Sequence, residues 1–168
     1  MTDFFPENIE KLAREVLAAA RAKGFKVATA ESCTGGLVAG ALTEIPGSSD
    51  VFERGFSTYS NRAKHELLGV PDAILRSAGA VSEPCARAMA EGALRAAPVQ
   101  ATVAITGIAG PGGGSSDKPA GLVHFAAART GGETVALERR FGDIGRSKVR
   151  LLSVETALQM LLDAIRKS

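Results

Sequence analysis

A hydroxyl and a thiol lie side by side in the segment Glu31-Ser32-Cys33-Thr34-Gly35-Gly36, directly after a short apolar run. Free N–H groups at the start of a helix can hold a phosphate or an oxyanion, and glycines let a ligand approach the backbone closely. Ser32 at such a strand-to-helix turn could act as a nucleophile. The alternative is that Ser32 or Thr34 only caps the helix that follows.

Lys64 lies downstream, after the polar segment Ser57-Thr58-Tyr59-Ser60-Asn61. At its ordinary pKa of about 10.4 a lysine is protonated, but burial among apolar groups can lower that pKa by several units. A serine with a neutral lysine is a known pairing of nucleophile and base. Tyr59 could pass a proton or stack on a flat ring. The plainer alternatives are an exposed Lys64 and a Tyr59 that packs in a strand.

The run from Thr106 to Gly121 is rich in glycine and follows a second apolar run. It lacks the Gly-Lys-Ser/Thr ending of a P-loop, and no dinucleotide-binding helix begins there, so nucleoside triphosphate binding is not indicated. Its backbone N–H groups could still wrap the ribose and phosphate of a nucleotide. The alternative is an irregular surface excursion with no binding role.

Other reactive side chains give weaker signals. Arg146 and Arg150 lie one helical turn apart, where two guanidiniums can receive a phosphate. His65 and His124 have no neighbouring ligands at zinc spacing, so we expect no metal site. Cys33 is a rival nucleophile, because a helix N-terminus lowers the pKa of a thiol, but no histidine stands in an obvious pairing with it.

The composition is that of one ordinary globular domain. The chain has 168 residues, of which 45% are hydrophobic and 23% charged, with 20 Lys and Arg against 18 Asp and Glu. This charge balance leaves no broad basic surface for nucleic acid. No apolar run approaches the roughly 20 residues of a membrane span, and the first ten residues do not resemble a secretory signal. With two isolated cysteines and no need of a disulfide, we expect a soluble, cytoplasmic, single domain over 1–168.

The elements that would carry these residues alternate between helix and strand. Helical periodicity or capping residues predict helices over 6–24, 35–44, 61–69, 71–78, 82–97 and 151–165. Apolar or alternating runs predict strands over 25–30, 52–60, 99–105, 122–128 and 134–141. Because Thr130-Gly131-Gly132 separates the last two strands, they should form an antiparallel hairpin. We therefore expect an α/β three-layer sandwich, with a mixed, mostly parallel sheet and helices on both faces. The final helix packs on the sheet or on a second subunit, which leaves a homo-oligomer open.

Four motifs together resemble one family, the C-terminal domain of the competence/damage-inducible protein CinA, which also occurs alone as nicotinamide mononucleotide deamidase. The motifs are Ala30-Glu31-Ser32-Cys33-Thr34-Gly35-Gly36, Thr58-Tyr59-Ser60-Asn61 with Lys64, Gly79-Ala80-Val81-Ser82-Glu83, and Thr106-Gly107-Ile108-Ala109-Gly110-Pro111. They cover nearly the whole chain in order. The larger CinA proteins carry an additional N-terminal domain linked to ADP-ribose pyrophosphatase activity, which we do not expect here.

The resemblance implies hydrolysis of the carboxamide of nicotinamide mononucleotide, in pyridine nucleotide salvage, without a cofactor. In this hypothesis Lys64 is the base, Ser32 the nucleophile and Tyr59 a proton relay. Ser48, in a Gly-Ser-Ser context, is the reserve nucleophile. The expected substrate-binding residues are Glu31, Cys33, Thr34, Gly35, Gly36, Ser48, Asn61, Thr106, Gly107, Gly110, Gly112 and Arg146.

Two questions stay open at this point. The family shows Gly-Asp-Arg near the final helix, whereas this chain has Gly142-Asp143-Ile144-Gly145-Arg146, so either Arg146 or Arg150 could hold the phosphate. The same loops would also suit a noncatalytic nucleotide-binding module, and the competence name suggests an interaction protein in DNA uptake or repair. The enzyme would release ammonia, whereas neither alternative would.

Overall fold

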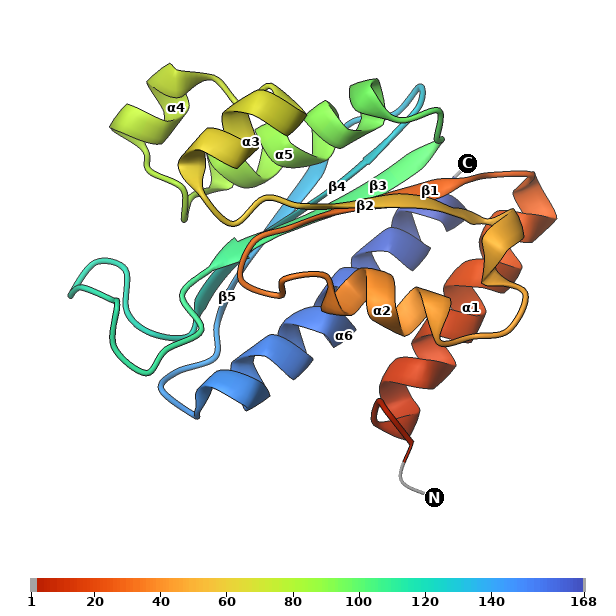
Figure 1. The fold of residues 1–168 in the computed structure, drawn as a ribbon, viewed down its shortest axis with the longest axis horizontal. Helices are drawn as coiled ribbons and strands as arrows, with labels where there is room; N and C mark the ends of the chain where they lie inside the picture. The colour runs from red at the N-terminus through yellow and green to blue at the C-terminus, as the bar shows by residue number, and fades with distance from the viewer. Residues whose placement is uncertain (1–2, 168) are drawn as a thin grey trace.

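A computed structural model describes residues 3–167 as a five-stranded sheet covered by helices on both faces (Figure 1). One layer holds α1, α2 and α6, and the other holds α3, α4 and α5. In chain order the elements are α1 (Glu7–Lys23), β1 (Val27–Glu31), α2 (Leu37–Thr43), the 3₁₀ turn η1 (Ser48–Asp50), β2 (Phe52–Ser57), α3 (Asn61–Leu68), α4 (Asp72–Ser77), α5 (Glu83–Ala96), β3 (Ala101–Gly107), β4 (Leu122–Arg129), β5 (Val135–Arg140) and α6 (Arg146–Arg166). The predicted α/β sandwich is confirmed.

The sheet has the order β2-β1-β3-β4-β5, and only β4 runs against the other four strands. Strand β1 pairs in parallel with both β2 and β3. The carboxyl ends of these three parallel strands therefore meet at one edge of the sheet, where α/β proteins commonly bind ligands. The predicted hairpin of β4 and β5 is also confirmed, since the two strands pair antiparallel.

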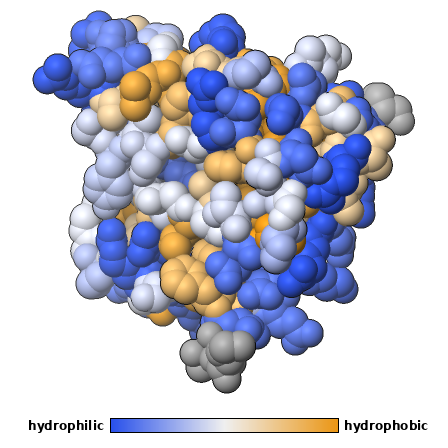
Figure 2. Space-filling model, turned by 45° about the vertical axis from the view of Figure 1, so that its right-hand side comes forward, coloured by the Kyte–Doolittle hydropathy of each residue, from blue (hydrophilic) through white to orange (hydrophobic). Residues whose placement is uncertain are grey.

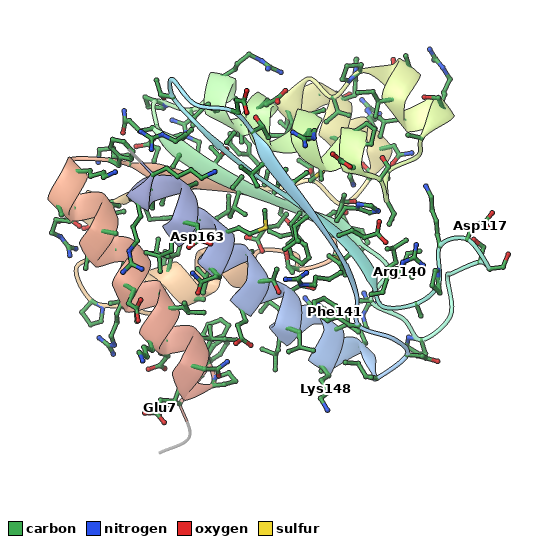
Figure 3. All side chains as sticks on the ribbon, turned by 180° about the vertical axis from the view of Figure 1, so that it is seen from behind. Glu7, Asp117, Arg140, Phe141, Lys148 and Asp163 are labelled. Carbon is green, nitrogen blue, oxygen red and sulfur yellow. The ribbon has the colours of Figure 1, made fainter. Side chains whose placement is uncertain are left out.

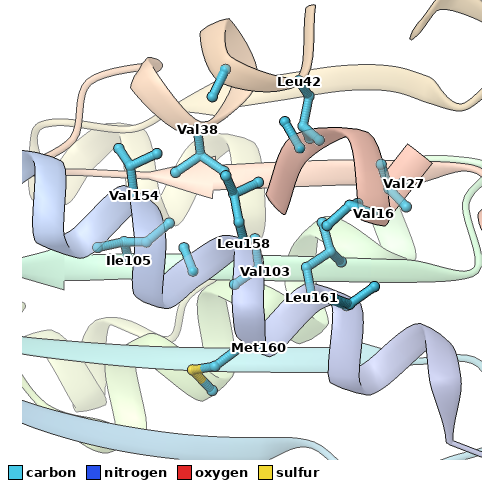
Figure 4. Close-up of a cluster of buried hydrophobic side chains, with 14 of the residues drawn as sticks. Val16, Val27, Val38, Leu42, Val103, Ile105, Val154, Leu158, Met160 and Leu161 are labelled. Atoms are coloured by element: carbon cyan, nitrogen blue, oxygen red, sulfur yellow. The ribbon is translucent and has the colours of Figure 1, made fainter. Parts of the chain in front are cut away.

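The two faces of the sheet are packed differently. Larger side chains such as Val103, Ile105 and Phe125 point toward α1, α2 and α6 and join one hydrophobic core, part of which is drawn in Figure 4. The opposite face presents mainly alanine to α5, including Ala30, Ala104, Ala126 and Ala128. Small side chains let a helix approach a sheet closely. Helix α5 is itself packed tightly, because a Cβ on Gly92 would lie 1.9 Å from the carbonyl oxygen of Leu68.

Element boundaries differ from the predictions by a few residues, for reasons visible in the backbone. The first strand starts at Val27 rather than at Phe25, because Gly24 adopts a left-handed conformation and the Phe25 N–H still donates to Ala20. Helix α2 starts at Leu37 because Gly35 and Gly36 both have positive φ. The expected caps are confirmed where Ser60 and Ser82 accept hydrogen bonds from the N–H groups of Ala63 and Cys85.

The segment 107–121, which we call the glycine loop, projects from the body of the molecule at the carboxyl end of β3 (Figure 1). Figure 3 shows Asp117 near its tip. Helix α6 packs against α1 and the sheet, and packing on the sheet was one of the two arrangements predicted for the final helix. On the face drawn in Figure 2, hydrophobic residues are scattered among hydrophilic ones. No helix within residues 3–167 is long and apolar enough to cross a membrane.

Candidate active site

The turn between β1 and α2, residues 32–36, carries Ser32 and is called here the Ser32 turn. Its first three residues are buried: Ser32 is 8% exposed, Cys33 5% and Thr34 0%. The Ser32 N–H donates to Ile105 O at 2.9 Å, and the Gly35 N–H donates back to Ser32 O at 3.0 Å. The backbone therefore holds the hydroxyl at the carboxyl end of the parallel strands.

Lys64 reaches the same place from α3. Its side chain is 1% exposed, and Nζ lies 2.9 Å from Ser32 Oγ. Nζ also donates to the carbonyl oxygens of Thr58, at 2.8 Å, and Tyr59, at 3.2 Å. A neutral amine has two N–H bonds and one lone pair. If the two carbonyls take the N–H bonds, the lone pair is left to accept the proton of the serine hydroxyl.

Burial favours the neutral form of that amine. It lowers the pKa of Lys64 below its ordinary value, and the nearby thiols Cys85 and Cys33 oppose the shift only in part. No hydrogen-bonded carboxylate offsets the effect in the described part of the chain, because the Nζ contacts are one hydroxyl and two carbonyls. The site thus holds a hydroxyl beside an amine that loses its proton more readily than a surface lysine.

A cavity of about 340 Å³ opens beside this pair. That size suits a small-molecule ligand. Nine of the predicted site residues line it: Ser32, Cys33, Tyr59, Lys64, Thr106, Arg146 and the glycines of the loop at 107, 110 and 112. The sequence therefore identified residues from the Ser32 turn, α3, β3, the glycine loop and α6, and from Tyr59 before α3, that the fold brings to one place.

Arg146, from α6, and Tyr59, from the segment between β2 and α3, meet at this cavity. One nitrogen of the Arg146 guanidinium donates to Gly110 O at 2.9 Å and another to the Tyr59 hydroxyl at 3.1 Å. Tyr59 is 64% exposed, so its ring is not packed inside the sheet. Thr106 is buried and donates its hydroxyl to Ala80 O at 2.9 Å. Its side chain thereby holds the segment before α5 against the cavity.

Six residues that we expected to bind substrate do not line the cavity. Glu31 turns away from it, since its carboxylate accepts hydrogen bonds from Thr34 Oγ1 at 2.7 Å, Val38 N at 2.9 Å and Ala39 N at 3.0 Å. Ser48 lies in η1 and Asn61 is exposed at the start of α3. The full set is Glu31, Thr34, Gly35, Gly36, Ser48 and Asn61.

The two arginines of α6 have separate positions. Arg150 does not line the cavity; its Nε donates to Cys33 O at 3.0 Å and another nitrogen donates to Thr34 O at 3.3 Å. Arg146 alone of the two faces the cavity. The sequence could not tell which arginine faces the cavity, because residues i and i+4 share one helix face. The two differ only in the segment that each contacts, the glycine loop for Arg146 and the Ser32 turn for Arg150.

The thiol of Cys33 is not activated. Burial raises its pKa to about 11, although the Arg150 and Lys64 charges oppose the rise. The expectation that a helix N-terminus would favour the thiolate is therefore wrong for this site, because desolvation outweighs it. Within the described residues, no group of three His, Cys, Asp or Glu side chains could hold a metal ion.

Sequence reasoning missed several lining residues because they carry no reactive group. These are Ala80, Val81, Ile108, Ala109, Pro111 and Gly113. Five of them lie in the motifs that carried the family resemblance, which was the available signal. Lys118 was also missed: it reaches back from the glycine loop and donates to Ala78 O at 2.6 Å. No local pattern indicates that long-range contact.

The family model of the CinA C-terminal domain matches residues 9–165 of the chain. The chain belongs to the CinA C-terminal domain family. Among curated relatives, a nicotinamide-nucleotide amidohydrolase PncC from Enterobacter agglomerans is 49% identical over 93% of this chain and 94% of its own length. A CinA-like protein from Akkermansia muciniphila is 54% identical, but this chain spans 34% of that relative.

Solved structures of the CinA family share the fold. A competence/damage-inducible protein from Agrobacterium tumefaciens is 52% identical, with a TM-score of 0.96 over 99% of this chain and 100% of that one. A competence damage-inducible protein from Klebsiella pneumoniae is 36% identical, with a TM-score of 0.88 over 94% of this chain and 96% of that one. Both cover the chain almost end to end, so the family assignment extends to the whole described fold.

Proposed function

We propose that this CinA-family domain is an amidohydrolase that converts nicotinamide mononucleotide to nicotinic acid mononucleotide and ammonia. The observation that carries the proposal is the 2.9 Å contact between Ser32 Oγ and the buried amine of Lys64, at the wall of a cavity. The name of the Enterobacter relative, which is matched over nearly its whole length, supports the substrate. The enzyme would need no cofactor.

The proposed chemistry begins with proton transfer from Ser32 to the neutral Lys64 amine. Ser32 Oγ then forms a bond to the carboxamide carbon, giving a tetrahedral intermediate with a charged oxygen. The C–N bond breaks as Lys64 returns the proton to the leaving nitrogen, which departs as ammonia. Water, deprotonated by the same amine, cleaves the ester and restores the Ser32 hydroxyl.

The N–H of Cys33 is the best candidate to stabilise the charged oxygen. Cys33 directly follows the nucleophile and lines the cavity, and its N–H makes no backbone hydrogen bond within residues 3–167. Gly35 is less suitable because its N–H is already donated to Ser32 O.

The other end of the substrate would lie toward the glycine loop and Arg146. A guanidinium binds a phosphate through charge-assisted hydrogen bonds, and Arg146 is the arginine of α6 that lines the cavity. A phosphate would compete with Gly110 O and the Tyr59 hydroxyl for the same N–H groups. Tyr59 would then be released to contact the substrate or relay a proton, as the resemblance implied.

Ammonia release from nicotinamide mononucleotide tests the proposal. The intact protein should release ammonia and form the acid, and Ser32→Ala should reduce turnover by at least about 10³-fold while folding normally. Ser48→Ala is the matched control, because Ser48 does not line the cavity, and it should keep nearly full activity. A folded intact protein that binds the nucleotide without releasing ammonia would instead be a binding module. Undiminished turnover by Ser32→Ala would remove Ser32 as the nucleophile.

A further inference from the structure

Arg150 lies directly beneath the Ser32 turn but outside the cavity. Its guanidinium donates to two consecutive carbonyls, those of Cys33 and Thr34. The contact is close on the turn itself, since a Cβ built on Gly35 would lie 3.5 Å from an Arg150 nitrogen. The side chain comes from a helix 116 residues further along the chain. It therefore ties the turn to a separate, well-packed element.

Glu31 holds the same turn from the other side. Its buried carboxylate receives the Thr34 hydroxyl and the N–H groups of Val38 and Ala39 at the start of α2. Gly36, at the N-cap position of α2, provides no side-chain cap. The carboxylate thus replaces the missing cap and fastens the end of β1 to α2. Glu31 thus accepts hydrogen bonds from Thr34 and the start of α2, while Arg150 donates to the carbonyls of Cys33 and Thr34.

We propose that Arg150 is a positioning residue for the proposed reaction. It holds Ser32 Oγ and the Cys33 N–H in the positions that the reaction needs, without touching the substrate. The proposal rests on the proposed function. An arginine suits this task because its planar guanidinium carries several donors at fixed angles, whereas a lysine offers one flexible ammonium. Displacement of a reacting group by about 1 Å can reduce a rate by about 10²-fold.

Arg150 could also act through its charge alone, because that charge lowers the pKa of the Cys33 thiol even though burial dominates there. Geometry and charge make different demands on a substitution. Arg150→Lys keeps the positive charge but loses the paired donors, whereas Arg150→Met loses both. If geometry is what matters, the two variants should be impaired to a similar extent. If charge is what matters, Arg150→Lys should be nearly normal.

The experiment measures kcat and KM for ammonia release by Arg150→Met and Arg150→Lys, with Lys148→Met as the control on an exposed residue of α6 (Figure 3). We expect kcat to fall by about 10- to 100-fold in both Arg150 variants, with KM within threefold of normal and an unshifted pH profile. Added methylguanidine should restore part of kcat in Arg150→Ala. A normal kcat in Arg150→Met, or a loss confined to KM, overturns the proposal.

A second measurement does not depend on activity. The Gly35 and Leu37 N–H groups donate to Ser32 O and Thr34 O, so their hydrogen exchange reports whether the turn is held. Exchange at both should accelerate in Arg150→Met and stay unchanged in Lys148→Met. If the intact protein releases no ammonia, the proposed function fails, and this exchange still decides the role of Arg150. Unchanged exchange in a folded Arg150→Met protein overturns the proposal.

Discussion

The Ser32 turn and the glycine loop both line the cavity, but they are held in place in different ways. The first three residues of the Ser32 turn are buried, and hydrogen bonds from β3, α2 and α6 converge on the turn and on Glu31 before it. In the glycine loop, residues 111–117 are all exposed. Two long side chains, Arg146 and Lys118, connect that loop to other segments.

This difference in support matches the task that each segment would have in the proposed reaction. A nucleophile and its oxyanion donor must be preorganised to within a fraction of an ångström, so rigid support is useful there. A loop that surrounds a ribose and a phosphate must admit the substrate and release the product, which requires less stable contacts. We therefore expect substitutions at the Ser32 turn to lower kcat and substitutions at the glycine loop to raise KM.

The largest effect should come from the base. Lys64→Met keeps the length of the side chain but removes the amine, so kcat for ammonia release should fall by about 10²- to 10⁴-fold, as expected for loss of a general base. Stability should be retained, because the position is buried and methionine is apolar. A thermal melt is the folding control. Turnover comparable with that of the intact protein would show that another group accepts the proton.

Arg146→Met should weaken substrate binding on the side of the cavity formed by the glycine loop. Charge-assisted hydrogen bonds are worth about 1.5–3 kcal/mol, so KM should rise by about 10- to 100-fold while kcat changes little. Comparison of the mononucleotide with the nucleoside that lacks the phosphate locates the interaction, because the nucleoside should be insensitive to the substitution. Equal losses for both substrates would place the role of Arg146 elsewhere than at the phosphate.

Lys118→Met should have a smaller effect of the same kind. It removes the hydrogen bond from the glycine loop to Ala78, just before the cavity-lining Ala80 and Val81. A single hydrogen bond contributes about 0.5–1.5 kcal/mol, so KM should rise by about two- to tenfold. Steady-state kinetics measures this directly. A fall in kcat without a change in KM would contradict the expectation that the glycine loop serves binding and the Ser32 turn serves catalysis.

Cys33→Ala should change turnover least, by no more than about twofold, although the residue lies next to the nucleophile. Burial raises the pKa of this thiol to about 11, so at neutral pH it is neither charged nor nucleophilic. Its N–H, which the proposal uses, remains in the variant. The removed sulfur is buried, so the free energy of unfolding should fall by about 1 kcal/mol. Large loss of kcat would give the thiol a chemical role.

The sequence predicted most of the fold because the fold depends on local patterns. Apolar runs, glycines and capping residues such as Ser60 and Ser82 each leave a signal within a few neighbouring positions. The elements and their order were confirmed. The errors were at boundaries such as Phe25 and Gly35, where backbone conformation decides and the side-chain pattern does not.

The candidate site was predicted less completely, because chemistry-bearing residues resemble supporting ones in sequence. Glu31 and Ser32 are adjacent, yet their side chains point in opposite directions, as successive side chains along a strand do. Glu31 points toward α2 and Ser32 toward the cavity. Arg146 and Arg150 differ only in what lies opposite them. The carbonyls of Thr58 and Tyr59 that contact Lys64 cannot be inferred from residue type, since every residue has one.

The central claim is that Lys64 is a neutral amine beside Ser32 at working pH, and NMR titration of the Lys64 side chain tests it most directly. Because burial lowers the pKa of Lys64, its nitrogen signal should change at a pH clearly below the ordinary value of about 10.4. The folded protein should also gain stability as pH rises from the lowered pKa to the ordinary one, since the unfolded chain binds the extra proton there. A Lys64 signal that titrates at or above about 10.4 would contradict the account.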